Sequence, residues 1–247
     1  MQGGNNMTEP KIAVVTGAAG GVGGATVRLL VSDGWRVIAT VRREEQVAQL
    51  NAIRGVSAYA LDLLDSDRVM QWANDLVHRE TPRIDLVVHT AAIAPVGPAA
   101  LGDAQTWEST LKTNVEAPAL LNAGLLPAVR AAQGTIVFIN SGAGERAVAR
   151  HAIYASSKHA LRGYANTLRL EEAQYRVRVA SIYPGQIDTK MLRGIDEQLG
   201  VDFHPEQYIN PQTVADTVLW IANAPDDVHF TNIDVRPRQE VSAQFNV

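Results

Sequence analysis

The feature that most restricts the fold of this chain is a repeated alternation between short β-branched runs and longer amphipathic stretches. Short β-branched runs predict strands, and apolar residues that recur every three or four positions predict helices. The predicted strands are Ile12–Thr16, Arg36–Val41, Val56–Ala60, Ile84–His89, Thr135–Asn140, Arg176–Ile182 and His229–Arg236. The predicted helices are Gly21–Ser32, Glu44–Arg54, Ser66–Glu80, Asp103–Ala131, Ala152–Gln174 and Pro211–Ala224.

This alternation predicts the α/β class. Strands joined by helical crossovers run parallel, and a parallel sheet is covered by helices on both faces. We therefore expect a doubly wound parallel β-sheet of the Rossmann type, with ligands at the carboxyl ends of the strands. A chain of 247 residues has room for one such domain rather than two. Residues 10–247 are predicted to form that domain, and residues 1–9 a flexible tail.

Composition excludes several classes of protein. A net charge of −4 with 46% hydrophobic residues is typical of a globular protein and gives no basic surface for nucleic acid. The chain contains no cysteine, so it has no disulfide, no thiolate nucleophile and no cysteine-based metal site. No stretch approaches the roughly 18 uncharged apolar residues that span a bilayer. We expect a cytoplasmic protein with no nucleic-acid partner, no membrane partner and no metal.

A glycine-rich turn follows the first predicted strand. It reads Gly17-Ala18-Ala19-Gly20-Gly21-Val22-Gly23-Gly24 and opens the helix Gly21–Ser32. Glycines let backbone N–H groups approach a phosphate closely, and the helix N-terminus adds its positive dipole end. The turn therefore predicts a dinucleotide site, although an ordinary turn between strand and helix also favours glycine. Its spacing, Gly-x3-Gly-x-Gly, differs from the commoner Gly-x-Gly-x2-Gly.

The end of the second predicted strand bears on the choice of cofactor. Proteins of this fold that use NAD place an acidic side chain there, which binds the adenosine ribose hydroxyls. This strand instead ends in Val41-Arg42-Arg43, with no carboxylate. Arg42 lies where a guanidinium pairs with a 2′-phosphate, so NADP(H) is favoured over NAD(H). The alternative is a solvated helix start, although two cations at that position oppose the helix dipole.

Tyr154-x3-Lys158 lies on the predicted helix Ala152–Gln174, where residues four apart share a face. A free phenol titrates at about 10, and a nearby ammonium favours the phenolate. Tyr154 is therefore predicted as a general acid/base that Lys158 activates. Ser141 ends another predicted strand thirteen residues before Tyr154, where its hydroxyl would hold a substrate oxygen. Taken singly, the first motif also fits a surface helix pair, and a serine before glycine also fits a turn.

Together these motifs resemble the short-chain dehydrogenase/reductase family, in its single-domain branch of about this length, over nearly the whole chain. Thr16-Gly17-x3-Gly21-x-Gly23, Ser141, Tyr154-x3-Lys158 and Pro184-Gly185 occur in the family's order and places. The resemblance implies hydride transfer between a nicotinamide and a small-molecule carbonyl or alcohol, with Tyr154 as proton donor or acceptor. It also implies that Asn114 holds a water against Lys158.

The resemblance further implies a set of cofactor contacts. In the family the counterpart of Asp62 contacts the adenine, that of Ile187 binds the carboxamide through its backbone, and that of Thr189 contacts the amide or pyrophosphate. The implied cofactor residues are Gly17, Ala19, Gly20, Gly21, Val22, Gly23, Arg42, Asp62, Leu63, Ala91, Ala92, Tyr154, Lys158, Pro184, Gly185, Ile187 and Thr189.

Three positions depart from the family pattern. Gly20 lies where many relatives that use NADP carry a basic residue. His89-Thr90-Ala91-Ala92 replaces the usual Asn-Asn-Ala-Gly, and His89 is expected to be a packed residue at the strand end. The C-terminal region lacks the Asp-Gly-Gly that often closes the last strand of tetrameric relatives. We expect a homodimer or homotetramer built on the long helices Asp103–Ala131 and Ala152–Gln174, although core packing also explains their pattern.

The substrate pocket is expected to draw on Gly142–Arg150, Tyr183 and a candidate substrate loop at residues 185–210. Arg146, Arg150 and His151 suit an anionic or polar substrate, and they also suit a solvated surface. Two other functions compete with an oxidoreductase. One is a non-catalytic NADP(H)-sensing regulator on the same fold, and the other is a sugar-nucleotide epimerase or dehydratase. Retention of all four catalytic residue types argues against the regulator, and the short region after Pro184 argues against the epimerase.

Overall fold

The computed structural model describes residues 9–239, which form one seven-stranded, all-parallel sheet in the order β3-β2-β1-β4-β5-β6-β7. This confirms the predicted doubly wound α/β fold. The strands are β1 (Ile12–Thr16), β2 (Arg36–Val41), β3 (Val56–Ala60), β4 (Leu86–His89), β5 (Thr135–Ile139), β6 (Arg178–Pro184) and β7 (Asn232–Val235). The predicted tail at residues 1–9 lies almost wholly outside the described residues.

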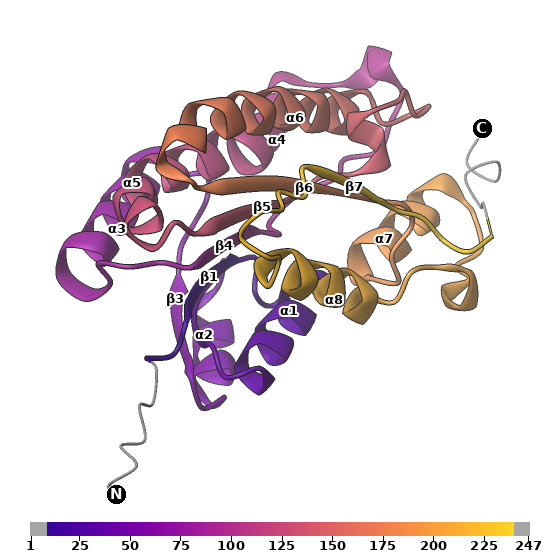
Figure 1. Cartoon of the computed structure of the whole chain (residues 1–247). Coiled ribbons are helices and arrows are strands. Elements are labelled where there is room, and N and C mark those ends of the chain that lie inside the picture. Colours follow the sequence, from indigo (N-terminus) through magenta and orange to yellow (C-terminus); the bar gives the residue numbers. More distant parts are fainter. Residues whose placement is uncertain (1–8, 240–247) are drawn as a thin grey trace, which may run out of the picture.

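Helices cover both faces of the sheet (Figure 1). The helices are α1 (Gly21–Ser32), α2 (Glu44–Asn51), α3 (Ser66–Asp75), α4 (Ala104–Leu111), α5 (Ala117–Ala132), α6 (Ala152–Glu172), α7 (Lys190–Leu199) and α8 (Pro211–Ala222). One apolar core lies between the sheet and α1, α2 and α8, and a second lies between the sheet and α3, α5 and α6. Alternate residues of the strands point into these two cores, which explains why the strands are apolar throughout.

The strand order places the site. The chain moves outward from β1 to β2 and β3, then returns to lay β4 on the other side of β1, with Val14 pairing Ile38 on one side and Val87 on the other. The loops after β1 and β4 therefore leave the sheet toward opposite faces. In open sheets of this kind the crevice that this reversal creates, at the carboxyl ends of the strands, is where ligands bind.

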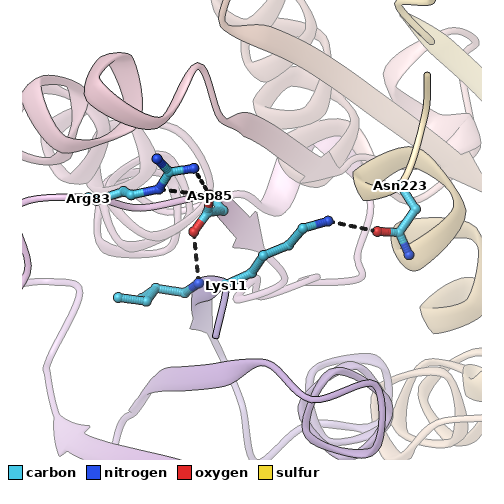
Figure 2. A network of polar contacts seen from close by, with 5 residues as sticks. Lys11, Arg83, Asp85 and Asn223 are labelled. Atoms are coloured by element: carbon cyan, nitrogen blue, oxygen red, sulfur yellow. Dashed lines mark hydrogen bonds and ion pairs between the residues drawn. The ribbon is translucent and has the colours of Figure 1, made fainter. Parts of the chain in front are cut away.

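A polar network holds the amino ends of the central strands, opposite the crevice (Figure 2). The Asp85 carboxylate accepts hydrogen bonds from the backbone N–H of Ile12 at 2.9 Å and from the Arg83 guanidinium at 2.9 Å. Lys11 donates to the Asn223 side chain at 3.2 Å, which links the start of β1 to the end of α8. These contacts join the amino ends of β1 and β4, away from the crevice.

The long predicted helix Asp103–Ala131 is interrupted. A π-helical turn, Lys112–Glu116, separates α4 from α5. Pro118 explains the widened turn, because it has no N–H to donate to the carbonyl of Asn114 four residues earlier. The predicted helix Ser66–Glu80 also ends in a π-helical turn, Leu76–Glu80.

The region after β6 contains a helix that was not predicted from the sequence. Helix α7 begins at Lys190, where the Thr189 hydroxyl accepts a hydrogen bond from Leu192 N, and it ends before Gly200, which has a φ of 70°. A threonine cap and a left-handed glycine are ordinary helix boundaries. Both signals were present in the sequence, and the apolar residues Met191, Leu192, Ile195 and Leu199 between them recur at helical spacing. No helix within residues 9–239 is long and apolar enough to cross a membrane.

Candidate active site

One large cavity, of about 1640 Å³, opens at the carboxyl ends of the strands. It exceeds the ~300–1,000 Å³ typical of pockets for drug-sized ligands, so it has room for an extended cofactor together with a substrate. Every residue that was predicted to contact the cofactor lines this cavity, and so does Ser141. The cavity is therefore lined by segments that lie far apart in the sequence, from Gly17 to Thr189.

The glycine turn after β1 leaves no room for side chains. Gly17 has a φ of 64°, and a Cβ added there would lie 2.8 Å from the backbone of Ala91. A Cβ on Gly23 would lie 2.3 Å from the carbonyl oxygen of Gly17. The turn is thus packed tightly against the helix and against the loop after β4, and it points the N-terminus of α1 at the cavity. These features fit a pyrophosphate cradle.

The sequence His89-Thr90-Ala91-Ala92 after β4 is hydrogen-bonded to the end of β1, where this turn begins. The Thr90 hydroxyl donates to the carbonyl oxygen of Thr16 at 2.5 Å, and Thr90 N donates to the Thr16 hydroxyl at 3.2 Å. Ala91 N also approaches that hydroxyl, at 3.3 Å. The ends of β1 and β4 are therefore fastened side by side, so the departure from Asn-Asn-Ala-Gly keeps the backbone of Ala91 and Ala92 on the cavity wall.

His89, the first residue of that departure, is a packed residue. It is buried, its ring stacks on Phe138 with centroids 5.0 Å apart, and its Nε2 lies 2.9 Å from the Asn122 side-chain oxygen. Burial lowers the pKa of His89 to about 4, with the Asn122 hydrogen bond opposing the shift in part. His89 is therefore neutral at physiological pH and does not line the cavity.

The end of the cavity near β2 carries three cationic side chains. Arg42 and Arg43 line it as the strand end predicts, and Arg28 joins them from the second turn of α1. Arg28 was not predicted, because only the fold brings that turn beside the end of β2. The Asp62 carboxylate accepts a hydrogen bond from Leu64 N at 3.0 Å and also lines this end. The arrangement suits a phosphate beside the adenosine.

The side chains of Ser141, Tyr154 and Lys158 meet on one wall of the same cavity. Ser141 follows β5, and its oxygen accepts a hydrogen bond from Ala143 N at 3.1 Å. Tyr154 and Lys158 lie one turn apart on α6, with the Lys158 Nζ 5.8 Å from the centre of the Tyr154 ring. Lys158 Nζ also donates to the carbonyl oxygen of Ile139 at 2.9 Å. The three groups therefore come from two neighbouring elements and face one space.

The ionisation of these groups follows from their burial. Burial raises the pKa of the Tyr154 phenol above its ordinary value, and a hydrogen bond with the Ser141 side chain partly offsets this. Burial lowers the pKa of Lys158 to about 8. At neutral pH the phenol therefore carries its proton, and most of the lysine is an ammonium. This arrangement can donate a proton to an oxygen placed between Ser141 and Tyr154.

Asn114 lies behind this wall rather than on the cavity surface. It sits in the π-helical turn, buried, and its side chain accepts from Ile93 N at 2.9 Å and donates to the oxygens of Ile93 and Ser157, each at 2.9 Å. Ser157 in turn donates to the Tyr154 carbonyl oxygen at 2.7 Å. These contacts use both amide hydrogens of Asn114 and tie the loop after β4 to helix α6. No hydrogen bond joins Asn114 to Lys158 directly within residues 9–239.

The structure corrects part of the predicted substrate pocket. Arg146 and His151 line the cavity, but Arg150 does not. Tyr183 is fully buried in β6, where its hydroxyl contacts the Asn232 side chain at 3.3 Å, because side chains alternate between the two faces of a strand. Arg236, just after β7, lines the cavity and was not predicted. Neither sequence separation nor motif spacing indicates that approach.

The candidate substrate loop is closed at its base. Ile187 and Ile209 form an isolated parallel bridge, in which Asp188 N donates to the carbonyl oxygen of Ile209 at 2.9 Å. Helix α7 lies between these two ends and lines the cavity through Lys190 to Arg193. Asp196 of α7 accepts a hydrogen bond from the Tyr208 hydroxyl at 3.0 Å. The segment thus forms a compact flap over one side of the cavity.

Known proteins resemble this chain along most of its length. A family model described as short chain dehydrogenase matches residues 11–200. A probable NADP-dependent dehydrogenase of Haemophilus influenzae is 28% identical over 244 residues, which cover 95% of this chain and 96% of the relative. A serine 3-dehydrogenase of Agrobacterium fabrum is 30% identical over 245 residues, covering 95% and 96%. The crystal structure of a metagenomic short-chain oxidoreductase in complex with NADP has a TM-score of 0.78 at 31% identity and covers 93% of this chain and 98% of its own.

Proposed function

This chain belongs to the short-chain dehydrogenase family, and on that premise we propose that it reduces a carbonyl compound, or oxidises the matching alcohol, with Tyr154 as the general acid or base. The chain is an NADP-dependent oxidoreductase, in agreement with one relative named as a probable NADP-dependent dehydrogenase and with another whose structure was solved with NADP. The prediction of NADP(H) over NAD(H) is confirmed. Arg28, Arg42 and Arg43 are the residues that we assign to its 2′-phosphate.

The observation that carries the proposal is that Ser141, Tyr154 and Lys158 line the same cavity as the glycine turn. When bound, NADPH supplies the hydride. In the reductive direction the carbonyl carbon gains a hydride, the C=O π pair moves onto oxygen, and that oxygen takes the proton of the Tyr154 hydroxyl. One carbonyl, one NADPH and one proton thus give one alcohol and one NADP⁺.

Each side chain has its own part in this step. The Ser141 hydroxyl holds the substrate oxygen, where negative charge develops. The Lys158 ammonium stabilises the phenolate that Tyr154 leaves behind. Asn114 is a positioning residue, because it holds the turn of α6 that carries Tyr154 through Ser157. A water held between Asn114 and Lys158 would return the proton from solvent, and residues 185–210 would cover the substrate.

The test is turnover by the whole chain. Purified protein is mixed with NADPH or NADH and a panel of ketones and aldehydes, and in the opposite direction with NADP⁺ and alcohols that include L-serine. We expect consumption of NADPH, weaker use of NADH, and a stoichiometric alcohol product. Tight NADPH binding without turnover on any compound would contradict the proposal and favour the sensing regulator.

We also propose a cytoplasmic homodimer or homotetramer. Large apolar side chains on two helices support an interface between copies: Leu170 on α6 is 74% exposed and Trp220 on α8 is 54% exposed. Trp220 lies against Phe230 next to the edge strand β7, with ring centroids 3.9 Å apart. Light scattering of the purified chain tests the assembly, because a monomer at assay concentration would exclude it.

A further inference from the structure

Two arginines from distant segments meet beside Ser141. Arg146 follows the short turn Gly142–Gly144, and Arg236 follows β7, and both line the cavity. A Cβ added to Gly142 would lie 2.8 Å from Nη1 of Arg236 and 3.4 Å from Nη2 of Arg146. The two guanidinium groups therefore lie over the residue that directly follows the serine assigned to hold the substrate oxygen.

Two glycines make the space that Arg236 occupies. A Cβ added to Gly185 would lie 3.4 Å from both Cζ and Nη1 of Arg236, and a Cβ added to Gly142 would lie 2.8 Å from the same Nη1. Gly142 follows the end of β5 and Gly185 follows the end of β6, and these strands are neighbours in the sheet. A side chain at Gly142 would push the Arg236 guanidinium away, whereas a Cβ at Gly185 would first clash with Pro237, whose Cδ would lie 2.7 Å from it. Arg236 is thus held between the Ser141 loop and the Pro184 loop.

The charges on this side of the cavity are mainly positive. Among residues 9–239, the segment after β6 adds Lys190 and Arg193 to the cavity lining, together with one carboxylate, that of Asp188. The cations assigned to the 2′-phosphate lie at the other end of the cavity, near the end of β2. Glu145, which precedes Arg146, does not line the cavity. It lies 3.8 Å from Arg162, hydrogen-bonds to the Asp234 side chain and interacts electrostatically with both arginines, Arg162 and Arg146.

We propose that Arg146 and Arg236 bind a carboxylate of the substrate, so that the protein acts on oxo acids and hydroxy acids in preference to neutral ketones. Guanidinium groups match the two oxygens of a carboxylate with paired hydrogen bonds. Because the arginines lie over the residue after Ser141, the carboxylate is joined to the reacting carbon by a short chain. The proposal rests on the proposed function, since it names the substrate class of that same site.

The test compares acids with their own methyl esters. Pyruvate, acetoacetate and levulinate differ in the distance from carbonyl to carboxylate, and each is assayed with NADPH beside its methyl ester. We expect one acid to be reduced with a kcat/KM at least roughly tenfold above that of its ester. Arg146→Ala and Arg236→Ala should each lower the acid's kcat/KM by roughly tenfold or more and bring the acid-to-ester ratio toward one. The corresponding Lys variants should retain part of the preference.

Arg54→Ala is the matched control. Arg54 is exposed in the loop before β3, at the opposite edge of the sheet, so this variant removes the same charge and should keep the wild-type ratio. A second readout is the dissociation constant of butyrate, an unreactive carboxylate, from the protein saturated with NADPH. Butyrate should bind more weakly to both Ala variants.

The two readouts separate the proposals. Butyrate binding that depends on both arginines supports the carboxylate site even if no compound is reduced, and that absence of turnover would count against the proposed function alone. Equal kcat/KM for every acid and its ester, or butyrate binding that neither variant weakens, overturns the carboxylate site. Reduction of the esters in that case leaves the oxidoreductase in place.

Discussion

Substitution of Gly23 by alanine should disrupt the turn after β1, and the size of the effect follows from three distances. The added Cβ would lie 2.3 Å from the Gly17 carbonyl oxygen, 2.6 Å from the Thr90 hydroxyl and 2.9 Å from the Gly17 carbonyl carbon. Relief of these clashes requires a movement of roughly 1 Å, because ordinary carbon contacts begin near 3.5 Å. Two of the three atoms belong to backbone, so the turn itself must move.

Forced overpacking of this kind costs about 1–3 kcal/mol of unfolding free energy. In a domain of this size each kcal/mol lowers the Tm by roughly 2–4 °C. The same movement displaces the N–H groups aimed at the cofactor, and the loss of one hydrogen bond to a charged group costs about 1.5–3 kcal/mol. We therefore expect the Kd for NADPH to rise roughly 10-fold to 150-fold.

Thermal unfolding and a fluorescence titration with NADPH measure the two effects on one preparation. Gly163→Ala is the matched control, because nothing lies within 4 Å of a Cβ added to this glycine of α6. It should raise stability by about 0.5–1 kcal/mol, since glycine inside a helix is unfavourable, and leave the NADPH affinity unchanged. A Gly23→Ala protein with the Tm and NADPH affinity of the wild type would refute the assignment of this turn as a tightly packed cradle.

Three further predictions concern charge. Arg42→Asp should lower kcat/KM for NADPH by roughly 10-fold to 150-fold and raise kcat/KM for NADH, and Arg28→Ala should lower kcat/KM for NADPH by less. Unchanged selectivity between NADPH and NADH in steady-state assays of both variants would count against both residues. Reductive kcat/KM should fall above pH 8, because the ammonium of Lys158, with a pKa of about 8, then loses its proton, and a flat profile to higher pH would contradict this. The free energy of unfolding should fall by up to about 3 kcal/mol as pH drops from 6.5 toward 4, because His89 takes up a proton in the unfolded state while its pKa in the folded state is about 4. Denaturant unfolding of His89→Asn should show a smaller loss at acid pH, and a loss equal to that of the wild type would point to other groups.

The sequence predicted those parts of the molecule that depend on local pattern. Strands β1, β2 and β3 and helix α1 have the bounds expected from periodicity and from the glycine turn. Every predicted cofactor residue lines the cavity, because a doubly wound parallel sheet brings the carboxyl ends of all its strands to the same side of the molecule. Local signals therefore sufficed wherever a motif sits at the end of a regular element.

The parts that were missed depend on contacts between distant segments. Arg28 and Arg236 reach the cavity only because the fold brings α1 beside β2 and the segment after β7 beside Ser141. The inclusion of Arg150 and Tyr183 in the pocket was wrong, since adjacent positions point in different directions and only packing decides which one faces the cavity. Helix α7 was missed although its threonine cap and its terminal glycine were visible, and although Met191, Leu192, Ile195 and Leu199 recur at helical spacing along one face.

The most direct test of the mechanism is the turnover number of Tyr154→Phe, measured with a substrate that the wild type reduces and on protein shown to bind NADPH. The phenylalanine keeps the ring of Tyr154 and removes the proton that Ser141 and Lys158 are placed to direct. We expect kcat to fall roughly 10²-fold to 10⁴-fold while the Kd for NADPH stays near the wild-type value. A variant that retains most of the wild-type kcat would contradict the role of this hydroxyl as the proton donor.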